Sequence, residues 1–164
     1  MSLLEVSGLK KVYKTRFGGN AVEALRNVNF SVNEGEYVAI MGESGSGKTT
    51  LLNILAALDK PTAGTVLLDG RDFTKIRESE AATFRRDHLG FVFQEFNLLD
   101  TFTLEDNIYL PLVLAGKSYD EMRTRLIDIA ETLGIRELLK KYPYEVSGGQ
   151  KQRAAVARAL ITKP

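Results

Sequence analysis

The sequence at Gly42–Thr49 reads GESGSGKT, which matches the pattern G-x-x-x-x-G-K-[ST] at every defined position. The preceding segment, Tyr37–Met41, is apolar and rich in strand-forming residues, and the following segment, Thr50–Leu58, has apolar residues at helical spacing. A strand, a glycine-rich loop and a helix in this order are the context in which the pattern forms a phosphate-binding loop. The sequence therefore predicts an α/β fold organised around this loop.

Phosphate binding requires each residue type in the loop for a separate chemical reason. The glycines Gly42, Gly45 and Gly47 permit positive φ angles and close backbone approach, so that successive N–H groups can surround a phosphate. The helix that begins near Lys48 directs its unpaired amides and the positive end of its dipole at the same anion. We expect Lys48 to reach the β- and γ-phosphates of a nucleotide, and the Thr49 hydroxyl to ligate Mg²⁺. The nucleotide-binding residues predicted in the loop are Gly42, Ser44, Gly45, Ser46, Gly47, Lys48, Thr49 and Thr50.

The composition excludes several other classes of protein. The 164 residues are enough for one domain with one core. A net charge of +1 provides no general field that would attract nucleic acid or an anionic membrane. Because the chain has no cysteine, it has neither a disulfide framework nor a thiolate metal site. We expect no signal peptide and no bilayer-spanning segment, since no apolar stretch is long enough.

Short strands are expected on both sides of the loop. Besides Tyr37–Met41, the predicted strands are Leu3–Lys14, Ala21–Leu25, Val28–Val32, Thr65–Gly70 and Leu89–Phe93, with turns at 15–20 and 33–36. The strands ahead of the loop predict a small antiparallel layer on a nucleotide-binding core. The first of them is expected to be an edge or meander strand, and its basic cluster a solvated charged edge: Lys10, Lys11, Lys14 and Arg16.

Helices are predicted over most of the second half of the chain. In order, they cover residues 74–87, 103–115, 118–133 and 148–161. We expect Ser118 and Glu121 to form a capping box for the third of these, and Gly134 to stop it.

The last helix follows a second motif, Val146–Gln150, which reads VSGGQ. A serine cap and two glycines at a helix start make another N-terminus that can receive an anion. Taken alone, this motif is more often the start of an ordinary capped helix than an anion site. In combination with the phosphate-binding loop upstream, the motif becomes specific to one kind of nucleotide-binding protein.

With both motifs in place, the chain resembles the nucleotide-binding domain of ATP-binding-cassette (ABC) transporters over residues 1–164. The resemblance implies that Tyr13 stacks on adenine and that Gln94 contacts Mg²⁺ or water. It also implies that Ser147, Gly148, Gly149 and Gln150, the family signature, bind the γ-phosphate of ATP held by a second subunit. The cofactors implied are ATP and Mg²⁺. Lys48 and Gln94 are then the catalytic residues, with Thr49 and Gln94 at the metal.

The same resemblance implies an architecture. It is a P-loop NTPase (RecA-like) α/β core with an N-terminal antiparallel β layer and a helical signature subdomain, incomplete at the C-terminus. Residues 1–94 form the ATP-binding core and residues 95–164 the helical subdomain. The apolar residues between Gln94 and the next helix are left with two alternatives, core or the surface facing a membrane partner: Phe96, Leu98, Leu99, Phe102 and Leu104.

The amino-acid sequences of Gly90–Leu99 and Asn107–Leu112 are similar to those of one branch of the family, which contains the lipoprotein-release, macrolide-export and bacitracin-type peptide-resistance ATPases. The partners implied are a transmembrane permease subunit and a second copy or homologue across ATP, without nucleic acid. The place implied is cytoplasmic and peripheral, at the inner face of the cell membrane. The substrate implied is membrane-associated.

The family continues after the position of Pro164 into a strand ending in Asp-Glu and a later histidine, which serve Mg²⁺ and the attacking water. We therefore expect the parent protein to hydrolyse ATP and these 164 residues to be a fragment with little turnover. One alternative is a nucleotide-binding module without turnover. Another is a DNA-maintenance ABC ATPase, which would require a long coiled coil between Lys48 and Ser147. A small-molecule kinase would leave the signature unexplained.

Overall fold

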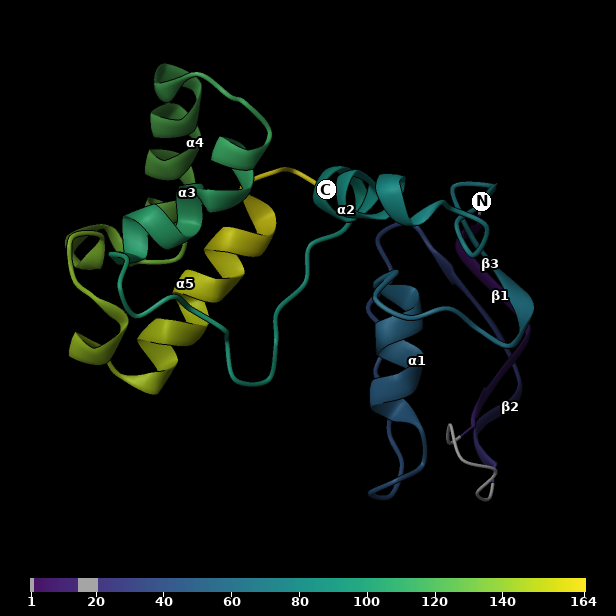
Figure 1. Cartoon of the computed structure of the whole chain (residues 1–164). Coiled ribbons are helices and arrows are strands. Elements are labelled where there is room, and N and C mark those ends of the chain that lie inside the picture. The colour runs from purple at the N-terminus through teal and green to yellow at the C-terminus, as the bar shows by residue number, and fades with distance from the viewer. Residues whose placement is uncertain (1, 15–20) are drawn as a thin grey trace. The chain divides into compact units, whose positions relative to one another are not determined.

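The computed structural model describes residues 2–14 and 21–164, and it divides into two compact units, Met1–Ala81 and Ala82–Pro164 (Figure 1). The turn expected at 15–20 and the charge of Arg16 lie outside the described residues. The functional division expected between residues 94 and 95 stays a prediction.

The first unit contains a four-stranded antiparallel sheet in the order β2-β1-β3-β4. The strands are β1 Ser2–Tyr13, β2 Val22–Asn33, β3 Ala63–Leu68 and β4 Arg71–Asp72. The predicted antiparallel layer is therefore confirmed. The prediction that β1 is an edge strand is wrong, because β3 returns after the phosphate-binding loop to pair with its free side.

The two strands predicted at Ala21–Leu25 and Val28–Val32 are a single strand, β2. The register against β1 shifts between Leu9, which pairs with Val28, and Lys11, which pairs with Leu25. In this interval β2 has one residue more than β1, and the interval contains Asn27, whose φ is 46°. A bulge therefore replaces the predicted break, because an unpaired residue in the left-handed region lets the ladder continue on both sides.

The two strands predicted next to functional motifs, Tyr37–Met41 and Leu89–Phe93, are irregular segments. Tyr37 is 97% exposed and Met41 is 88% exposed. A strand exists only through hydrogen bonds to a neighbour, and the described residues provide no partner strand for either segment. Their apolar composition is correct for strands, but it does not create the pairing.

Helix α1, Lys48–Leu55, starts where the phosphate-binding loop predicts. It ends three residues before the predicted Leu58, because Ala57 has a φ of 52° that no helical residue adopts. Its buried residues, Leu51 and Ile54, belong to the apolar interior of the first unit. Other buried residues of this unit are Val6, Leu9, Leu25, Val66, Phe73 and Ile76.

Helix α2, Glu78–His88, crosses the boundary between the units, and the second unit is otherwise helical. It contains α3 Leu104–Leu114, α4 Tyr119–Thr132, α5 Gly148–Leu160 and two short 3₁₀ turns, η1 Arg136–Leu138 and η2 Pro143–Glu145. One cluster forms its core: Leu104, Ile108, Tyr109, Leu112, Met122, Leu126, Ala130, Ile135, Leu138, Ala154, Ala157 and Ile161.

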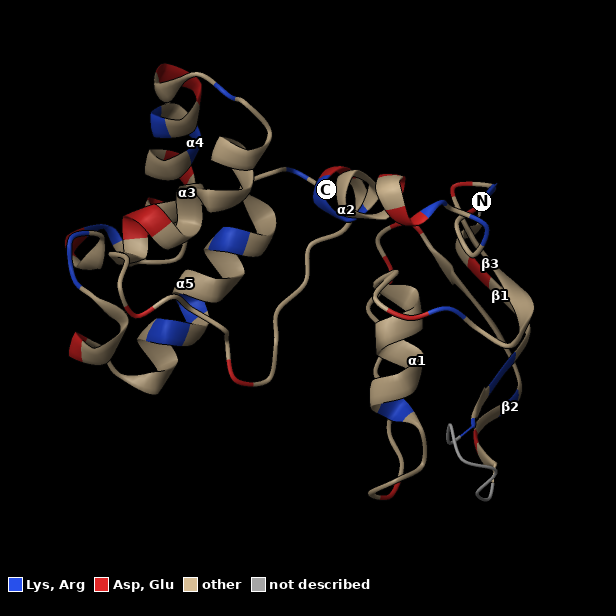
Figure 2. Cartoon of the chain, viewed as in Figure 1, with Lys and Arg blue, Asp and Glu red and all other residues tan. Residues whose placement is uncertain are grey.

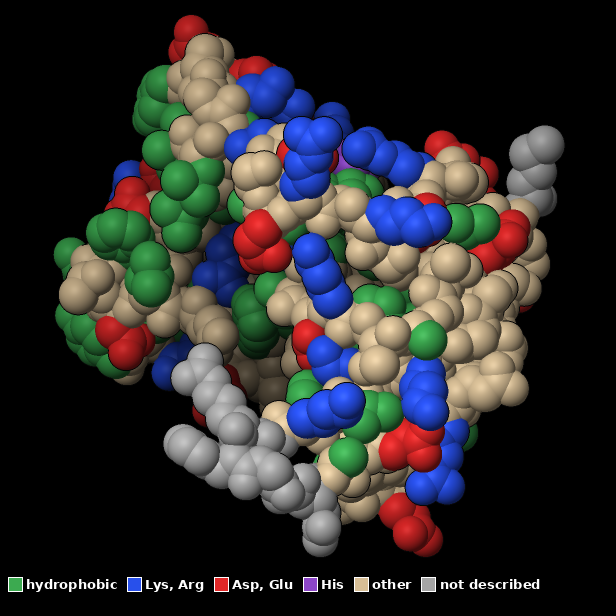
Figure 3. Space-filling model, turned by 45° about the vertical axis from the view of Figure 1, so that its right-hand side comes forward, with side chains coloured by type: hydrophobic (Ala, Val, Ile, Leu, Met, Phe, Trp, Pro, Cys, Tyr) green, Lys and Arg blue, Asp and Glu red, His purple; other side chains and the backbone are tan. Residues whose placement is uncertain are grey.

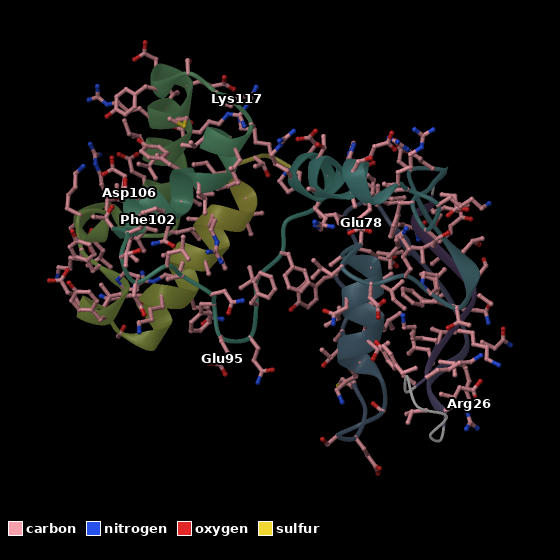
Figure 4. All side chains as sticks on the ribbon, viewed as in Figure 1. Arg26, Glu78, Glu95, Phe102, Asp106 and Lys117 are labelled. Atoms are coloured by element: carbon pink, nitrogen blue, oxygen red, sulfur yellow. The ribbon has the colours of Figure 1, made fainter. Side chains whose placement is uncertain are left out.

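The helix ends of this unit follow the sequence signals with one exception. Ser118 accepts a hydrogen bond from the Glu121 amide, and Gly134, with a φ of 60°, terminates α4. The reciprocal half of the capping box is missing, because the Glu121 carboxylate instead binds Arg125 at 2.7 Å. Figure 4 shows Phe102 and Asp106 at the start of α3, where Thr103 and Asp106 form a capping box that was not predicted.

Asn107 is a fully buried polar side chain that organises the segment ahead of α3. Its Oδ1 accepts from the Leu99 amide at 2.7 Å. Its Nδ2 donates to the backbone carbonyls of Leu99, Phe102 and Thr103 at 3.0, 3.2 and 2.9 Å. One amide thus makes four hydrogen bonds to backbone groups, among them the Leu99 amide and the Phe102 carbonyl, and thereby fixes the path of residues 99–103.

We expect Asn107→Ala to lower the free energy of unfolding by about 2–4 kcal/mol, because it removes four buried hydrogen bonds and takes the side-chain acceptor away from the Leu99 amide. The measurement is chemical denaturation followed by circular dichroism. The control is Gln152→Ala, which removes an exposed amide from α5 and should change the free energy by less than about 0.5 kcal/mol. Equal effects of the two substitutions would contradict the role given to Asn107.

Candidate nucleotide-binding site

The phosphate-binding loop has a lysine folded over its own backbone. Lys48 Nζ donates to the carbonyl oxygens of Gly42 and Glu43 at 2.7 and 2.6 Å, and lies 3.4 Å from Ser46 Oγ. The ammonium is therefore held at the loop by neutral acceptors. An anion entering the loop would replace them with acceptors of opposite charge, which bind an ammonium more strongly.

The N-terminus of α1 lacks a protein cap. Among the described residues no side chain caps it, and its first turn contains a basic residue but no acidic one (Figure 2). By contrast, α3, α4 and α5 are capped by Thr103, Ser118 and Ser147. Because the first amides of a helix have no intrahelical acceptor, those of α1 remain free to bind an external anion.

Two glycines in the loop occupy conformations that other residues avoid. Gly45 has a φ of 80° and Gly47 has a φ of 91°. A Cβ on Gly47 would also lie 2.4 Å from the Ala24 carbonyl oxygen, which belongs to β2. Gly47 is thus required both for the curl of the loop and for packing the loop against the sheet, and the second requirement was not visible in the sequence.

Thr49 is exposed in the first turn of α1, where its hydroxyl can reach an ion beside a bound phosphate. The described residues contain no group of three or more His, Cys, Asp or Glu that could hold a metal by themselves. This donor set fits Mg²⁺, which takes most of its ligands from water and nucleotide phosphates and few from the protein.

Tyr13, the predicted adenine-stacking residue, ends β1 in the same unit as the loop and is 42% exposed. Its hydroxyl donates to Asp59 Oδ2 at 2.8 Å. Lys11 donates to the other oxygen of Asp59 at 2.6 Å and is only 12% exposed. The prediction that Lys11 belongs to a solvated edge is therefore wrong, because the segment after α1 returns to cover this end of β1.

Gln94 lies in the second unit, in an exposed loop that also carries Glu95 (Figure 4). The following residues, Phe96 and Asn97, have φ values of 61° and 45°. Arg158 of α5 donates to both of their carbonyls, at 2.6 and 2.7 Å. Burial lowers the pKa of the Arg158 guanidinium below its ordinary value. This arginine, missed in the sequence, ties the signature helix to the loop after Gln94.

For some of the apolar residues after Gln94, the structure decides between the two alternatives of core and partner-facing surface. Leu104 is fully buried and Leu98 packs against the helical core. Leu99 and Phe102 are 43% and 40% exposed. For these last two, a surface facing a partner stays a prediction.

Ser147 caps α5 as predicted, and Gln150 completes a capping box. The Ser147 amide donates to Gln150 Oε1 at 2.8 Å, while the Gln150 amide reaches Ser147 Oγ only at 3.4 Å. Gly148 and Gly149 are exposed, and a Cβ on either would meet nothing within 4 Å. The signature therefore presents two exposed glycines and a serine hydroxyl whose cap bond is long.

The predicted site residues fall into two groups. The first unit contains Tyr13 and the loop residues Gly42, Ser44, Gly45, Ser46, Gly47, Lys48, Thr49 and Thr50. The second unit contains Gln94, Ser147, Gly148, Gly149 and Gln150. The nucleotide and metal roles of both groups remain predictions.

A protein-family model described as ABC transporter matches residues 25–164 of this chain. The ABC transporter ATP-binding protein YxdL of Bacillus subtilis is 50% identical over 163 residues, which are 99% of this chain and 62% of that protein. The bacitracin export ATP-binding protein BceA of Halalkalibacterium halodurans is 47% identical over 164 residues, 100% of this chain and 64% of that protein. The chain thus spans less than two thirds of the length of these curated relatives.

Among solved structures, the dimeric structure of MJ0796, a bacterial ABC transporter cassette, matches with a TM-score of 0.88 and 40% identity. The match covers 98% of this chain and 70% of that one. A dimeric post-hydrolysis state of the same cassette, bound to ADP and Pi, matches with a TM-score of 0.88 and 41% identity. The predicted fold class and the predicted resemblance are both confirmed.

Proposed function

The chain belongs to the ABC transporter family, and from this premise we propose that it is the ATP-binding subunit that couples ATP binding and hydrolysis to transport through a membrane permease. The observation that carries the proposal is the uncapped start of α1, with its positive-φ glycines and the ammonium of Lys48 held above them. These features together support an anion site that would take the phosphates of a nucleotide.

Specific residues would hold the nucleotide. The loop amides and Lys48 would hold the β- and γ-phosphates, Thr49 would hold Mg²⁺, and Tyr13 would stack on the adenine. Bound Mg²⁺ would neutralise charge that develops on the phosphates. Gln94 would contact the metal or the water, and its loop is braced by Arg158.

The signature would complete the site from a second copy. In this arrangement Ser147, Gly148 and Gly149 of one subunit contact the γ-phosphate bound by the other, so that ATP shifts the equilibrium towards a closed dimer. The exposed glycines at the start of α5, which leave room for close approach, support this role. So does the dimeric state of the MJ0796 cassette.

We also propose a membrane-associated substrate, of the antimicrobial-peptide class, on the basis of the name of the BceA relative. The partner would be a permease and the place the inner face of the cell membrane. Among the described residues, no helix has both the length and the apolar character needed to cross a bilayer. The membrane path would therefore come from the permease partner.

The alternative of a DNA-maintenance ATPase is disfavoured by the segment between the two motifs. It contains short helices of 11, 11 and 14 residues and no long coiled coil in the part that the structure describes. In the face shown in Figure 3, Lys and Arg side chains lie among Asp and Glu side chains. A net charge of +1 likewise gives no basic surface for nucleic acid.

The signature provides the test of this function. We expect Ser147→Arg to abolish dimerisation driven by a non-hydrolysable ATP analogue, because a long cation would occupy the position facing the γ-phosphate. Nucleotide binding to the monomer should stay within about 2-fold, since no loop residue changes. Light scattering measures the first quantity and calorimetry the second.

Two control variants separate the possible causes. Gln152→Arg adds the same charge at an exposed position of α5 and should leave dimerisation intact. Ser147→Ala removes the helix cap, at a cost of about 0.5–2 kcal/mol of stability, together with the proposed hydroxyl contact to the γ-phosphate, but it adds neither charge nor bulk. Normal dimerisation of Ser147→Arg would contradict the assigned role of the signature.

A further inference from the structure

Three side chains form a connected cluster at the end of β1. Asp59, in the segment after α1, accepts from Lys11 Nζ through Oδ1 at 2.6 Å and from the Tyr13 hydroxyl through Oδ2 at 2.8 Å. Lys11 Nζ also donates to the Lys60 carbonyl at 2.7 Å. The same ammonium lies over the Tyr13 ring, 4.8 Å from its centroid. Two β1 residues are thereby joined to a segment almost fifty residues later.

The cluster keeps its charges although it is partly buried. Burial by itself would raise the pKa of Asp59, but the hydrogen bonds from Lys11 and Tyr13 outweigh it and hold that pKa below its ordinary value. The carboxylate therefore remains ionised at neutral pH, and its two oxygens are committed to different partners. One oxygen anchors the cation and the other anchors the end of the tyrosine ring.

These contacts restrict Tyr13 in two ways. The hydroxyl bond fixes the far end of the ring, so the side chain does not exchange freely between rotamers. The ammonium occupies one face of the ring, where the cation is attracted by the negative face of the π system. A planar base can then stack only on the other face.

We propose that Asp59 and Lys11 are positioning residues that hold the Tyr13 ring ready to receive the base of the nucleotide, an inference that rests on the proposed function. Their effect is pre-organisation: the ring loses its rotamer freedom during folding instead of during binding. They contribute to recognition of the base and not to binding of the phosphates.

The test compares two ligands on the purified protein by titration calorimetry. ATP carries a base, whereas inorganic tripolyphosphate offers only the phosphates. We expect Asp59→Ala and Lys11→Met each to weaken ATP binding roughly 2- to 10-fold, the range expected for one immobilised side chain. Tripolyphosphate binding should be unchanged by either substitution, because the phosphate-binding loop is intact.

Tyr13→Phe provides a milder second variant that keeps the ring and removes only the hydroxyl. Its loss of ATP affinity should not exceed that of Asp59→Ala, which also releases Lys11, and the double variant should be no weaker than Asp59→Ala alone, since the hydroxyl bond is already absent there. The matched control is Lys10→Met, which removes the neighbouring charge. Among the described residues Lys10 pairs with Glu23, at 3.1 Å, and it makes no contact with the Tyr13 cluster, so ATP affinity should stay the same.

Two outcomes would overturn the positioning role. The first is unchanged ATP affinity in Asp59→Ala, Lys11→Met and Tyr13→Phe. The second is an equal loss for ATP and tripolyphosphate, which would show a general distortion of the unit.

The assignment of Tyr13 to the base is tested separately by Tyr13→Ala. Unchanged ATP affinity in that variant would refute the adenine contact itself, while a loss there with no loss in Asp59→Ala would refute only the positioning role.

Discussion

Replacement of Lys48 by alanine is expected to reduce ATP hydrolysis by the intact transporter roughly 10²- to 10³-fold or more, the effect of removing one group that stabilises developing charge. In the structure this ammonium lies above the loop, bound to the carbonyls of Gly42 and Glu43. It is therefore already close to the position of the phosphates and needs only to exchange neutral acceptors for charged ones. ATP binding should weaken as well, because the same contact exists before the reaction.

Steady-state phosphate release measures the rate, and calorimetry measures the affinity. Lys75→Ala is the matched control, since Lys75 is a 79% exposed lysine of the same unit that pairs only with Asp72 in the described contacts. It should leave both quantities unchanged. Normal hydrolysis by Lys48→Ala would show that this lysine is not part of the phosphate site.

The second large effect is expected at Gly64, in β3. Its φ is 90°, and a Cβ there would lie 2.5 Å from the Gly8 carbonyl oxygen and 2.6 Å from Leu9 Cα. Both atoms belong to the backbone of β1, at the place where the β1–β3 register shifts. We expect Gly64→Ala to destabilise the first unit by more than about 4 kcal/mol, because the two strands cannot separate there without losing their pairing.

Gly70→Ala separates the two causes of this effect. Gly70 also has a positive φ, 71°, but a Cβ on it would meet nothing within 4 Å. Its replacement should cost only about 1–2 kcal/mol, the strain of the left-handed conformation. Chemical denaturation followed by circular dichroism compares the two. Similar losses would mean that the contact with Gly8 is relieved easily and that the strands are less tightly joined than the structure indicates.

The helices were the most predictable elements, because their signals are local. Thr103, Ser118 and Ser147 each stand at a helix start and bond an amide three residues later. Gly134 ends α4 for an equally local reason, its positive φ. Strands were less predictable, since Tyr37–Met41 has the composition of a strand but no partner strand among the described residues.

The sequence by itself determined the phosphate-binding loop, the signature and the family to which they belong, because these motifs consist of consecutive residues whose backbone geometry is set locally, by glycines and by a capping serine. Only the tertiary structure decided the surroundings of Tyr13, the four hydrogen bonds of Asn107 and the brace from Arg158 to the loop after Gln94. Asp59 and Lys11 are separated by 48 positions, so no local pattern relates them. Their contact arises because β3 returns to pair with β1 and brings the segment after α1 with it, and such long-range pairing depends on the whole fold.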